Sequence, residues 1–383
     1  MDQSISNISF WEAQHLLQPS EYCIIGAGIV GINAALELRR LRPNANILLL
    51  DRGSFPLGAS TRNAGFACFG SASELLDDLS QQSEDTVFEL VEMRYAGLQA
   101  LQQVLQDHDF SYQACGNYEV FRSKDQSSFQ DCAAALPDLN RQLERITGIP
   151  ETFQIRDQQI SNFGFSGIDH LILNQSEGTI NTGQLIRHLI DLAQAQNIRM
   201  LWGMHVEKLG HHPTKVEIQL KNGWILESQQ ILLATNAFTL PLMPEVDLYP
   251  ARNQVLVSQE MPDLKLIGAF HLDQGYVYFR NIGQRLLIGG GRNIDLETET
   301  TDAFGHTQII QTNLLRIVKE HLLPHQKFKI DYQWSGILGV GKTKRPIIKN
   351  VNDRTTVAVR MGGMGVAIGT LVGQKAARLA LQL

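Results

Sequence analysis

The sequence has few cysteines, no long apolar run and no excess of basic residues, and each lack excludes a class of protein. The four cysteines among 383 residues form no Cys-x-x-Cys pair, so we interpret them as free thiols of a cytoplasmic protein. No run of about 18 apolar residues exists, so we expect no membrane span. The net charge of −6 offers no basic face, so we expect no nucleic-acid partner.

Two further absences concern targeting and metals. Residues 1–10 lack a basic segment followed by an apolar one, so no secretory signal is predicted. The eleven histidines show no metal-ligand spacing, and we expect no metal. The composition is otherwise that of a globular protein, with 43% hydrophobic residues, and the length favours two or three domains.

One N-terminal segment carries the clearest pattern. A short apolar run at residues 22–25 leads into a glycine turn at 26–31, a helical pattern at 34–41 and a second apolar run that ends at Asp51. In such a strand–turn–helix–strand unit the first glycine permits the tight turn, the second admits a pyrophosphate and the third lets the helix pack closely on the strand. The helix N-terminus attracts phosphate, and the acid can bind ribose hydroxyls. We predict a dinucleotide site at Gly26, Ala27, Gly28, Ile29, Val30, Gly31, Asp51 and Arg52.

The segment after Asp51 bears on the choice between NAD and FAD. An NAD enzyme would continue with regular alternation of strands and helices, whereas residues 58–65 read as a small, polar, glycine-bounded loop. Such a loop can press its backbone against a flat ligand and a phosphate. An ordinary surface loop has the same composition, so both interpretations stay open at this point.

Six motifs, in order along the chain, carry a resemblance to a known family. They are SFWEA at 9–13, ASTRNAG at 59–65, EGTIN at 177–181, ILLATNAF at 231–238, LIGGGR at 287–292 and GGMGV at 362–366. Together they resemble the D-amino-acid oxidase superfamily of FAD-dependent amine and amino-acid oxidoreductases, which includes glycine oxidase, sarcosine oxidase and gamma-glutamylputrescine oxidase. The resemblance implies FAD contacts at Ser60, Thr61, Arg62, Asn63, Ala64, Gly65, Val206, Ala234, Thr235, Asn236, Gly362, Gly363, Met364, Gly365 and Val366.

The resemblance also implies the fold and the binding mode. It implies an α/β fold with a Rossmann-like FAD-binding domain of the glutathione-reductase type and a second, α+β substrate domain on a mostly antiparallel sheet. The FAD-binding domain is expected at 1–85, 150–245 and 336–383, and the substrate domain at 86–149 and 246–335. We expect non-covalent FAD, because sarcosine oxidase types attach flavin through a cysteine near the last glycine-rich loop and no cysteine follows Cys132.

Local patterns agree with this layout. Apolar spacing predicts helices at 84–107, 125–147, 182–196 and 309–323, with Thr182 as the N-cap of the third. Strands are predicted at 118–121, 199–208 and 215–235, with a hairpin turn at Lys221-Asn222-Gly223, and again at 276–280 and 286–291.

The substrate site is expected on the strand near residue 278. Strand residues alternate between faces, so Tyr276, Tyr278 and Arg280 should share one side, where they could orient a polar substrate and anchor a carboxylate. A solvated sheet face is the plain alternative. Arg292 and Arg360 are further candidate anchors, because residues 335–341 lack the carboxylate-binding arginine of glycine oxidase relatives. Cys68 is interpreted as a packed thiol.

The resemblance implies oxidation of the C–N bond of a small amine or amino acid. A hydride would pass to flavin N5, and the imine would hydrolyse to a carbonyl and an amine or ammonia, with O2 or another acceptor reoxidising the flavin. Three alternatives stay open: a 2-hydroxy-acid dehydrogenase on the same scaffold, a flavin-binding redox sensor or complex subunit without turnover, and an NAD enzyme.

Overall fold

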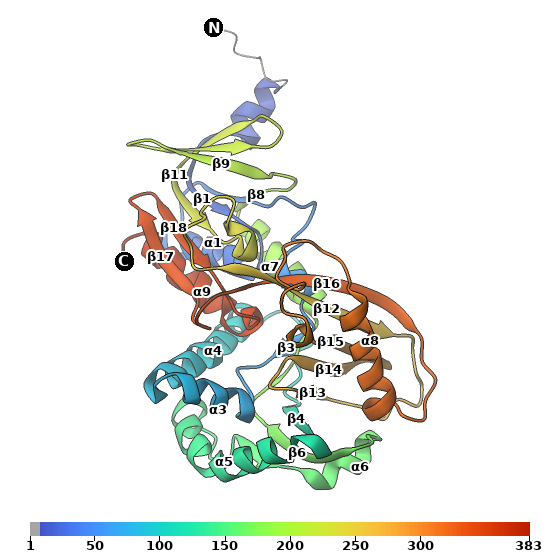
Figure 1. Ribbon diagram of the computed structural model, residues 1–383. Coiled ribbons are helices and arrows are strands. Elements are labelled where there is room, and N and C mark those ends of the chain that lie inside the picture. The colour runs from blue at the N-terminus through green and yellow to red at the C-terminus, as the bar shows by residue number, and fades with distance from the viewer. Residues whose placement is uncertain (1–7) are drawn as a thin grey trace.

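The apolar run at residues 22–25 lies in the middle of a mixed sheet whose central strands are parallel. The computed structural model describes residues 8–383 (Figure 1). β1 (Ser20–Ile25) pairs in parallel with β2 (Ile47–Leu50) and with β11 (Ile225–Leu233), and α1 (Ile29–Leu41) connects β1 to β2 as predicted. The strand order of this first sheet is β17-β18-β11-β1-β2-β8, with β10 and β9 added beside β11. Its other strands are β8 (Arg199–Leu201), β9 (Val206–His211), β10 (Val216–Leu220), β17 (Ile347–Asn352) and β18 (Thr355–Val359).

The central strands of the first sheet, above all β2 and β18, are buried on both faces, whereas β9 and β17 are largely exposed. Alternate residues point to opposite sides, so Ile24 joins one apolar core and Cys23 another. The core around Ile24 is shared with α1, α7 (Thr182–Ala195), α9 (Gly365–Ala380) and α4 (Glu84–Val104). This two-sided burial explains why β1 and β2 read as continuous apolar runs rather than as alternating patterns.

A second eight-stranded sheet forms the lower half of the molecule in Figure 1. Its order is β16-β12-β15-β14-β13-β4-β6-β5, and all but the β13–β4 pair are antiparallel. The bounds are β4 (Asn117–Arg122), β5 (Phe153–Ile155), β6 (Ile168–Asn174), β12 (Tyr249–Ser258), β13 (Ala269–Leu272), β14 (Val277–Ile282), β15 (Arg285–Gly290) and β16 (Ile330–Val340).

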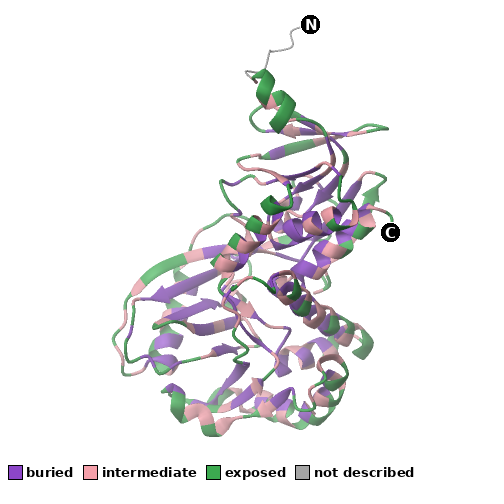
Figure 2. Ribbon diagram, turned by 180° about the vertical axis from the view of Figure 1, so that it is seen from behind, coloured by how far each residue is buried: buried purple, intermediate pink, exposed green. Residues whose placement is uncertain are grey.

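The two faces of the second sheet have different neighbours. Val277 and Phe279 pack in a core with α8 (Gln308–Ile317), whereas Tyr278 packs with Ala64 and Phe66 of the nucleotide half. The predicted alternation along this strand is therefore confirmed for Tyr278. Buried residues follow the strands of both sheets and the helices between them (Figure 2).

The remaining elements mostly match the predicted patterns. The predicted helices at 84–107 and 125–147 are α4 and α5 (Gln126–Thr147), and the helix at 309–323 is α8 extended by the π-helical turn η6 (Val318–Leu322). The hairpin turn at 221–223 joins β10 to β11. Shorter elements are α2 (Ala59–Arg62), α3 (Ala72–Gln81), α6 (Ile160–Phe163), β3 (Phe66–Ala67) and β7 (Gly178–Thr179).

The N-cap prediction for α7 is wrong by one residue. The side chain of Asn181, not Thr182, accepts hydrogen bonds from the backbone N–H groups of Gly183 and Gln184, at 3.0 and 3.1 Å. Thr182 Oγ1 instead donates to Asn63 Oδ1 at 2.8 Å. Asparagine is as good a cap as threonine, so tertiary contact decides which of the two neighbours fills the position.

Hydrogen bonding divides the chain differently from the predicted borders. β5 and β6 lie within the range 150–245 expected in the cofactor domain, but they pair with each other and with β4 in the second sheet. The border expected at 336 falls inside β16, which pairs with β12 along its whole length. Helix α4 packs on α9 of the nucleotide half, although it was expected in the substrate domain. The first seven residues of the range 1–85 lie outside the described residues.

Among residues 8–383, no helix is long and apolar enough to cross a membrane. Within the same range, no group of three or more His, Cys, Asp or Glu side chains could hold a metal ion.

Candidate active site

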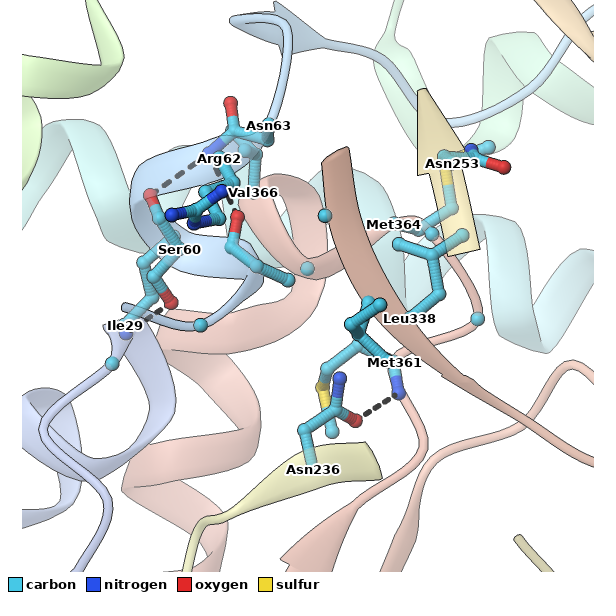
Figure 3. A pocket seen from close by; sticks show the side chains of 18 of the residues that line it. Ile29, Ser60, Arg62, Asn63, Asn236, Asn253, Leu338, Met361, Met364 and Val366 are labelled. Carbon is cyan, nitrogen blue, oxygen red and sulfur yellow. Dashed lines mark hydrogen bonds between the residues drawn. The ribbon is translucent and has the colours of Figure 1, made fainter. Parts of the chain in front are cut away.

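One long cavity of about 590 Å³ runs between the two sheets. Its nucleotide side is formed by the glycine turn before α1, by α2, by the residues after β11 and by the loop before α9 (Figure 3). Its opposite wall comes from β12, β14 and the loop before β14. Most of the predicted cofactor residues line this cavity: Gly26, Gly28, Ile29, Val30, Asp51, Arg52, Ser60, Arg62, Asn63, Ala64, Val206, Ala234, Thr235, Asn236, Gly362, Gly363, Met364, Gly365 and Val366.

The glycine turn leaves no room for side chains. Gly26 has φ +107°, and a Cβ there would lie 2.6 Å from the carbonyl oxygen of Ala234. A Cβ on Gly31 would lie 1.8 Å from the carbonyl oxygen of Gly26, so the helix can approach its strand only with glycine at this position. Gly31 and Ala27 do not line the cavity, but their contacts within the protein stabilise the turn: Gly31 packs against the Gly26 carbonyl, and the Ala27 N–H donates to Asp51.

Asp51 organises the same turn. Its carboxylate accepts from the N–H groups of Ala27 and Gly53, both at 2.9 Å. Burial raises the pKa of Asp51, and these two N–H donors oppose the rise. Next to it, the Arg52 guanidinium lies 3.7 Å from the centre of the Phe238 ring. Phe238 also lines the cavity, and the sequence analysis did not select it as a site residue.

The segment 59–65 is a short helix followed by a turn, not a loop throughout. Ser60 Oγ accepts from the Ile29 N–H at 2.9 Å, so this hydroxyl lies at the N-terminus of α1 (Figure 3). Asn63 Oδ1 accepts from the Gly65 N–H at 2.9 Å. Thr61 and Gly65 do not line the cavity, and Thr61 Oγ1 donates to the Gly58 and Pro56 carbonyls.

The last glycine-rich loop closes the middle of the cavity. Gly362 and Gly363 have φ values of +58° and +88°, which favour glycine. Asn236 Oδ1 accepts from the Arg360 and Met361 N–H groups, at 3.1 and 3.4 Å, and so joins this loop to the end of β11 (Figure 3). α9 then begins at Gly365 and directs its N-terminus toward the cavity lining.

Arg360 does not line the cavity. Its guanidinium pairs with Asp247 at 2.6 Å and donates to the Arg345 carbonyl at 2.8 Å. Through these contacts the Arg360 side chain stabilises the loop before α9. The structure therefore does not support Arg360 as a substrate anchor.

The wall opposite the glycine loops carries two phenols and a guanidinium. Tyr276 and Tyr278 both line the cavity, as predicted, together with Arg292. Burial raises the pKa of Tyr278 to about 12, so the phenol keeps its proton near neutral pH. The Arg292 guanidinium lies 5.2 Å from the centre of the Tyr276 ring. Within residues 8–383 it forms no hydrogen bond or ion pair, so its five N–H donors are available to a ligand.

Arg280 is placed differently from the prediction. It shares a sheet face with Tyr278, but it does not line the cavity. Its guanidinium donates to the carbonyl oxygens of Gly65 and Ile180, the latter at 3.1 Å. Burial lowers the pKa of Arg280 to about 10, and the group stays charged at neutral pH. The Arg280 guanidinium thus joins two backbone segments and, in contrast to the prediction, does not line the cavity.

The sequence analysis missed a polar end of the cavity. This polar end is formed by residues from five separate segments: Ser71, Glu74, Asp77, Arg94, Asn117, Glu177, His271 and Gln274. No local pattern identifies them, because each residue lies in an ordinary helix, strand or loop and only the tertiary fold brings them together. Cys68 lies beside this end, with its Sγ 3.9 Å from Met364 Sδ.

The cavity fits a dinucleotide with a flat ring system. Gly26, Gly28, Gly362 and Gly363, two helix N-termini and the half-buried Asp51 line one continuous space. Gly26, Gly28, Ser60 and the N-terminus of α1 would hold the phosphates. The segment 62–64 and the loop 362–364 would hold the ring between the two sheets.

Comparison with known proteins agrees with this geometry. The sequence model of the family described as "FAD dependent oxidoreductase" matches residues 21–379. The Haemophilus influenzae protein named "Probable oxidoreductase OrdL" is 21% identical over 94% of this chain and 82% of its own length. The crystal structure of L-proline dehydrogenase from P. horikoshii has a TM-score of 0.76 at 14% identity, covering 96% of this chain and 94% of the other. That of glycine oxidase from Geobacillus kaustophilus has a TM-score of 0.75 at 17% identity, covering 95% of both chains.

The match extends over nearly the whole chain, and the cavity offers the contacts that the cofactor of this family needs. The chain belongs to the FAD dependent oxidoreductase family and is an enzyme with FAD as its cofactor.

Proposed function

We propose that this enzyme oxidises the C–N bond of a small amine or amino acid that carries a carboxylate. The observation that carries the proposal is the wall of Tyr276, Tyr278 and Arg292, in which a guanidinium that forms no hydrogen bond or ion pair with residues 8–383 lines the cofactor cavity. A planar guanidinium binds a carboxylate through two parallel hydrogen bonds and so fixes its orientation. Similar structures include glycine oxidase and an iminodiacetate oxidase, whose names point to substrates of this kind.

Each residue of the wall has a distinct task in this proposal. Arg292 binds the carboxylate, and the stacked Tyr276 ring keeps the guanidinium in place. Tyr278 keeps its phenolic proton and donates a hydrogen bond to the substrate. Bound FAD supplies the two-electron acceptor. The apolar neighbours Val255 and Leu338 exclude water from the same space, which favours the neutral amine that oxidation requires.

An anaerobic reduction experiment tests the proposal. Purified protein with bound flavin is mixed without oxygen with matched pairs of an amino acid and its 2-hydroxy acid, such as alanine and lactate, and with simple amines. We expect bleaching of the flavin absorbance by amino compounds, with a carbonyl and ammonia or an amine as products. Bleaching by hydroxy acids alone would establish the dehydrogenase alternative, and no bleaching by any compound would favour a sensor or complex subunit.

The first prediction concerns Arg292. Replacing it in Arg292→Met removes the charge-assisted contacts to a carboxylate and keeps much of the stem, so the Michaelis constant should rise by about tenfold or more, with a smaller change in kcat. Steady-state kinetics with the substrate found above measures the effect. The matched control is Arg187→Met, since Arg187 is an exposed arginine on α7. An unchanged Michaelis constant in Arg292→Met would remove this residue from the substrate site.

A further inference from the structure

Four side chains form a continuous stack beside the cofactor cavity. The Arg52 guanidinium lies 3.7 Å from the centre of the Phe238 ring, and the Arg62 guanidinium lies 4.4 Å from the centre of the Phe304 ring. The centres of the two rings are 6.3 Å apart. These distances are those of attractive cation–π and aromatic contacts, so the four side chains hold one another in place. We call them the cation–aromatic stack.

The cation–aromatic stack separates the cavity from solvent. Arg52, Phe238 and Arg62 line the cavity. Phe304 does not line it, but it packs on two residues that do, and it is 40% exposed. Arg52 is exposed as well. One side of the stack therefore belongs to the inner surface of the cavity, and the other side faces water.

The stack also joins the two halves of the molecule. Arg52 follows β2, Arg62 belongs to α2 and Phe238 lies in the turn η4 (Asn236–Thr239) after β11, all in the nucleotide half. Phe304 is the one member of the stack that comes from the other half, where it lies in the segment between β15 and α8. Residues 295–307 of this segment are called the strap. The contacts of Phe304 thus complete the stack across the boundary between the two halves.

The strap is fixed to the second sheet by buried polar contacts. The carboxylate of Glu299, a residue only 1% exposed, accepts from the Arg252 guanidinium of β12 at 2.9 and 3.1 Å. The Gly305 N–H donates to the Ser335 hydroxyl of β16 at 2.9 Å. Charge-assisted bidentate bonds are strong, so the base of the strap stays on its own sheet. Phe304, next to Gly305, is the residue through which the strap meets the nucleotide half.

We propose that the strap closes the cofactor cavity, and that FAD enters or leaves only when the contacts of Phe304 are broken. Phe304 acts through Arg62 and Phe238, which line the cavity, and is therefore a positioning residue of the cofactor site. The stack consists of protein groups alone, so its contacts oppose entry of the cofactor as much as its release. The inference concerns exchange of FAD and does not depend on the proposed oxidation of amines.

Exchange of FAD in the purified enzyme tests the inference. Release is measured as the rate at which bound FAD is replaced by an excess of isotope-labelled FAD, and Kd by ultrafiltration of the holoenzyme at a series of dilutions. Phe304→Ala removes both ring contacts of the strap, so release should become at least about fivefold faster. Because entry becomes easier to the same extent, Kd should change by less than about twofold.

Further variants separate the aromatic face of Phe304 from its bulk. Phe304→Tyr keeps that face and should release FAD at the wild-type rate, whereas Phe304→Leu keeps apolar volume without it and should resemble Phe304→Ala. The matched control is Tyr332→Ala. Tyr332 is another exposed ring of the second sheet, beside the Arg285 guanidinium at 5.6 Å, but it lies outside the stack. Its loss should leave the release rate unchanged.

A release rate in Phe304→Ala equal to that of the wild type would overturn the inference. So would an equal acceleration in Tyr332→Ala, which would show a general loosening of the second sheet. A Kd that rises in proportion to the release rate would also overturn it, because Phe304 would then stabilise the bound cofactor instead of closing its path. If Phe304→Ala does not fold, Phe304→Leu is compared with Phe304→Tyr: faster release in the leucine variant would support the inference, and equal rates would overturn it.

Discussion

Arg280 holds together two carbonyl groups from distant parts of the chain. The Gly65 carbonyl ends the segment that lines the cavity, and the Ile180 carbonyl precedes the cap of α7. A buried guanidinium is costly unless its donors are used, and here the two carbonyls use them. The residue thus fixes the distance between the second sheet and the cofactor segment.

The second prediction follows from these contacts. Arg280→Met leaves the buried Ile180 carbonyl without its donor and removes one of the two donors of the Gly65 carbonyl, which still accepts from the Ile180 N–H at 2.9 Å, so the free energy of unfolding should fall by about 1–3 kcal/mol. Urea unfolding of the enzyme with bound FAD measures this loss. Arg292→Met is the control, because its guanidinium contacts the Tyr276 ring but forms no hydrogen bond or ion pair with residues 8–383, so its loss should change stability less. Equal stability of wild type and Arg280→Met would show that the two carbonyls find other donors.

The same residue shows what strand alternation can predict. A period of two correctly placed Tyr278 and Arg280 on one face and Val277 and Phe279 on the other. The alternation of residues along a strand could not show which loop would approach each side chain. The carbonyls of Gly65 and Ile180 lie next to the Arg280 guanidinium, whereas Tyr278 lines the cavity.

At the scale of elements, the cap of α7 connects a helix to the cofactor segment. Asn181 caps the helix, and the next residue, Thr182, donates to Asn63. The helix N-terminus and the segment 59–65 therefore hold each other in position. Helices were predicted well here because apolar residues at a period near 3.6 reflect burial of one face, which α5 and α7 both show.

The third prediction tests this cap. Asn181→Ala removes the acceptor for two N–H groups, and stability should fall by about 1 kcal/mol. Thermal unfolding followed by circular dichroism measures the change. Asn181→Asp retains a capping oxygen and should stay close to wild type. A loss in Asn181→Asp as large as in Asn181→Ala would mean that the amide group, not the cap, matters.

Element pairing also shows why contacts that cross the expected domain borders could not be predicted from local patterns. The packing of α4 on α9 depends on Gly97, where a Cβ would lie 2.1 Å from the Ala367 carbonyl oxygen. A single glycine inside a helical pattern does not indicate which partner comes close. Likewise β5 and β6 are short strands whose pairing with β4 depends on contacts distant in sequence.

At the scale of the whole molecule, buried carboxyl groups make stability depend on pH. Burial raises the pKa of Glu119 to about 7 from an ordinary value of 4.5, and its partners are Ser71 and Ser73. The folded state therefore binds the proton more tightly than the unfolded state. The stability from this group is fully present below 4.5 and is lost as the pH rises through about 7.

The fourth prediction uses this sign. In Glu119→Gln the amide can donate to the two serine hydroxyls and accept from the Ser73 N–H, so the fall of Tm between about pH 5 and pH 8 should become smaller. It should not vanish, because burial raises the pKa of Glu177 to about 8 and that group acts in the same direction. The test is to measure Tm between about pH 5 and pH 8 for the wild type, for Glu119→Gln and for the control Glu92→Gln. A slope unchanged from wild type would show that Glu119 does not titrate there.

The nucleotide sheet takes its strands from both ends of the chain. β1 comes from the first described residues, whereas β18 and α9 end at residues 359 and 380. β11 pairs with β1 on one side and with β18 on the other, and α1 packs on α9. During synthesis, the N-terminal turn must therefore wait for more than 300 further residues before its neighbours exist. The side of the cofactor cavity that β18 and α9 form is thus synthesised long after the glycine turn that it faces.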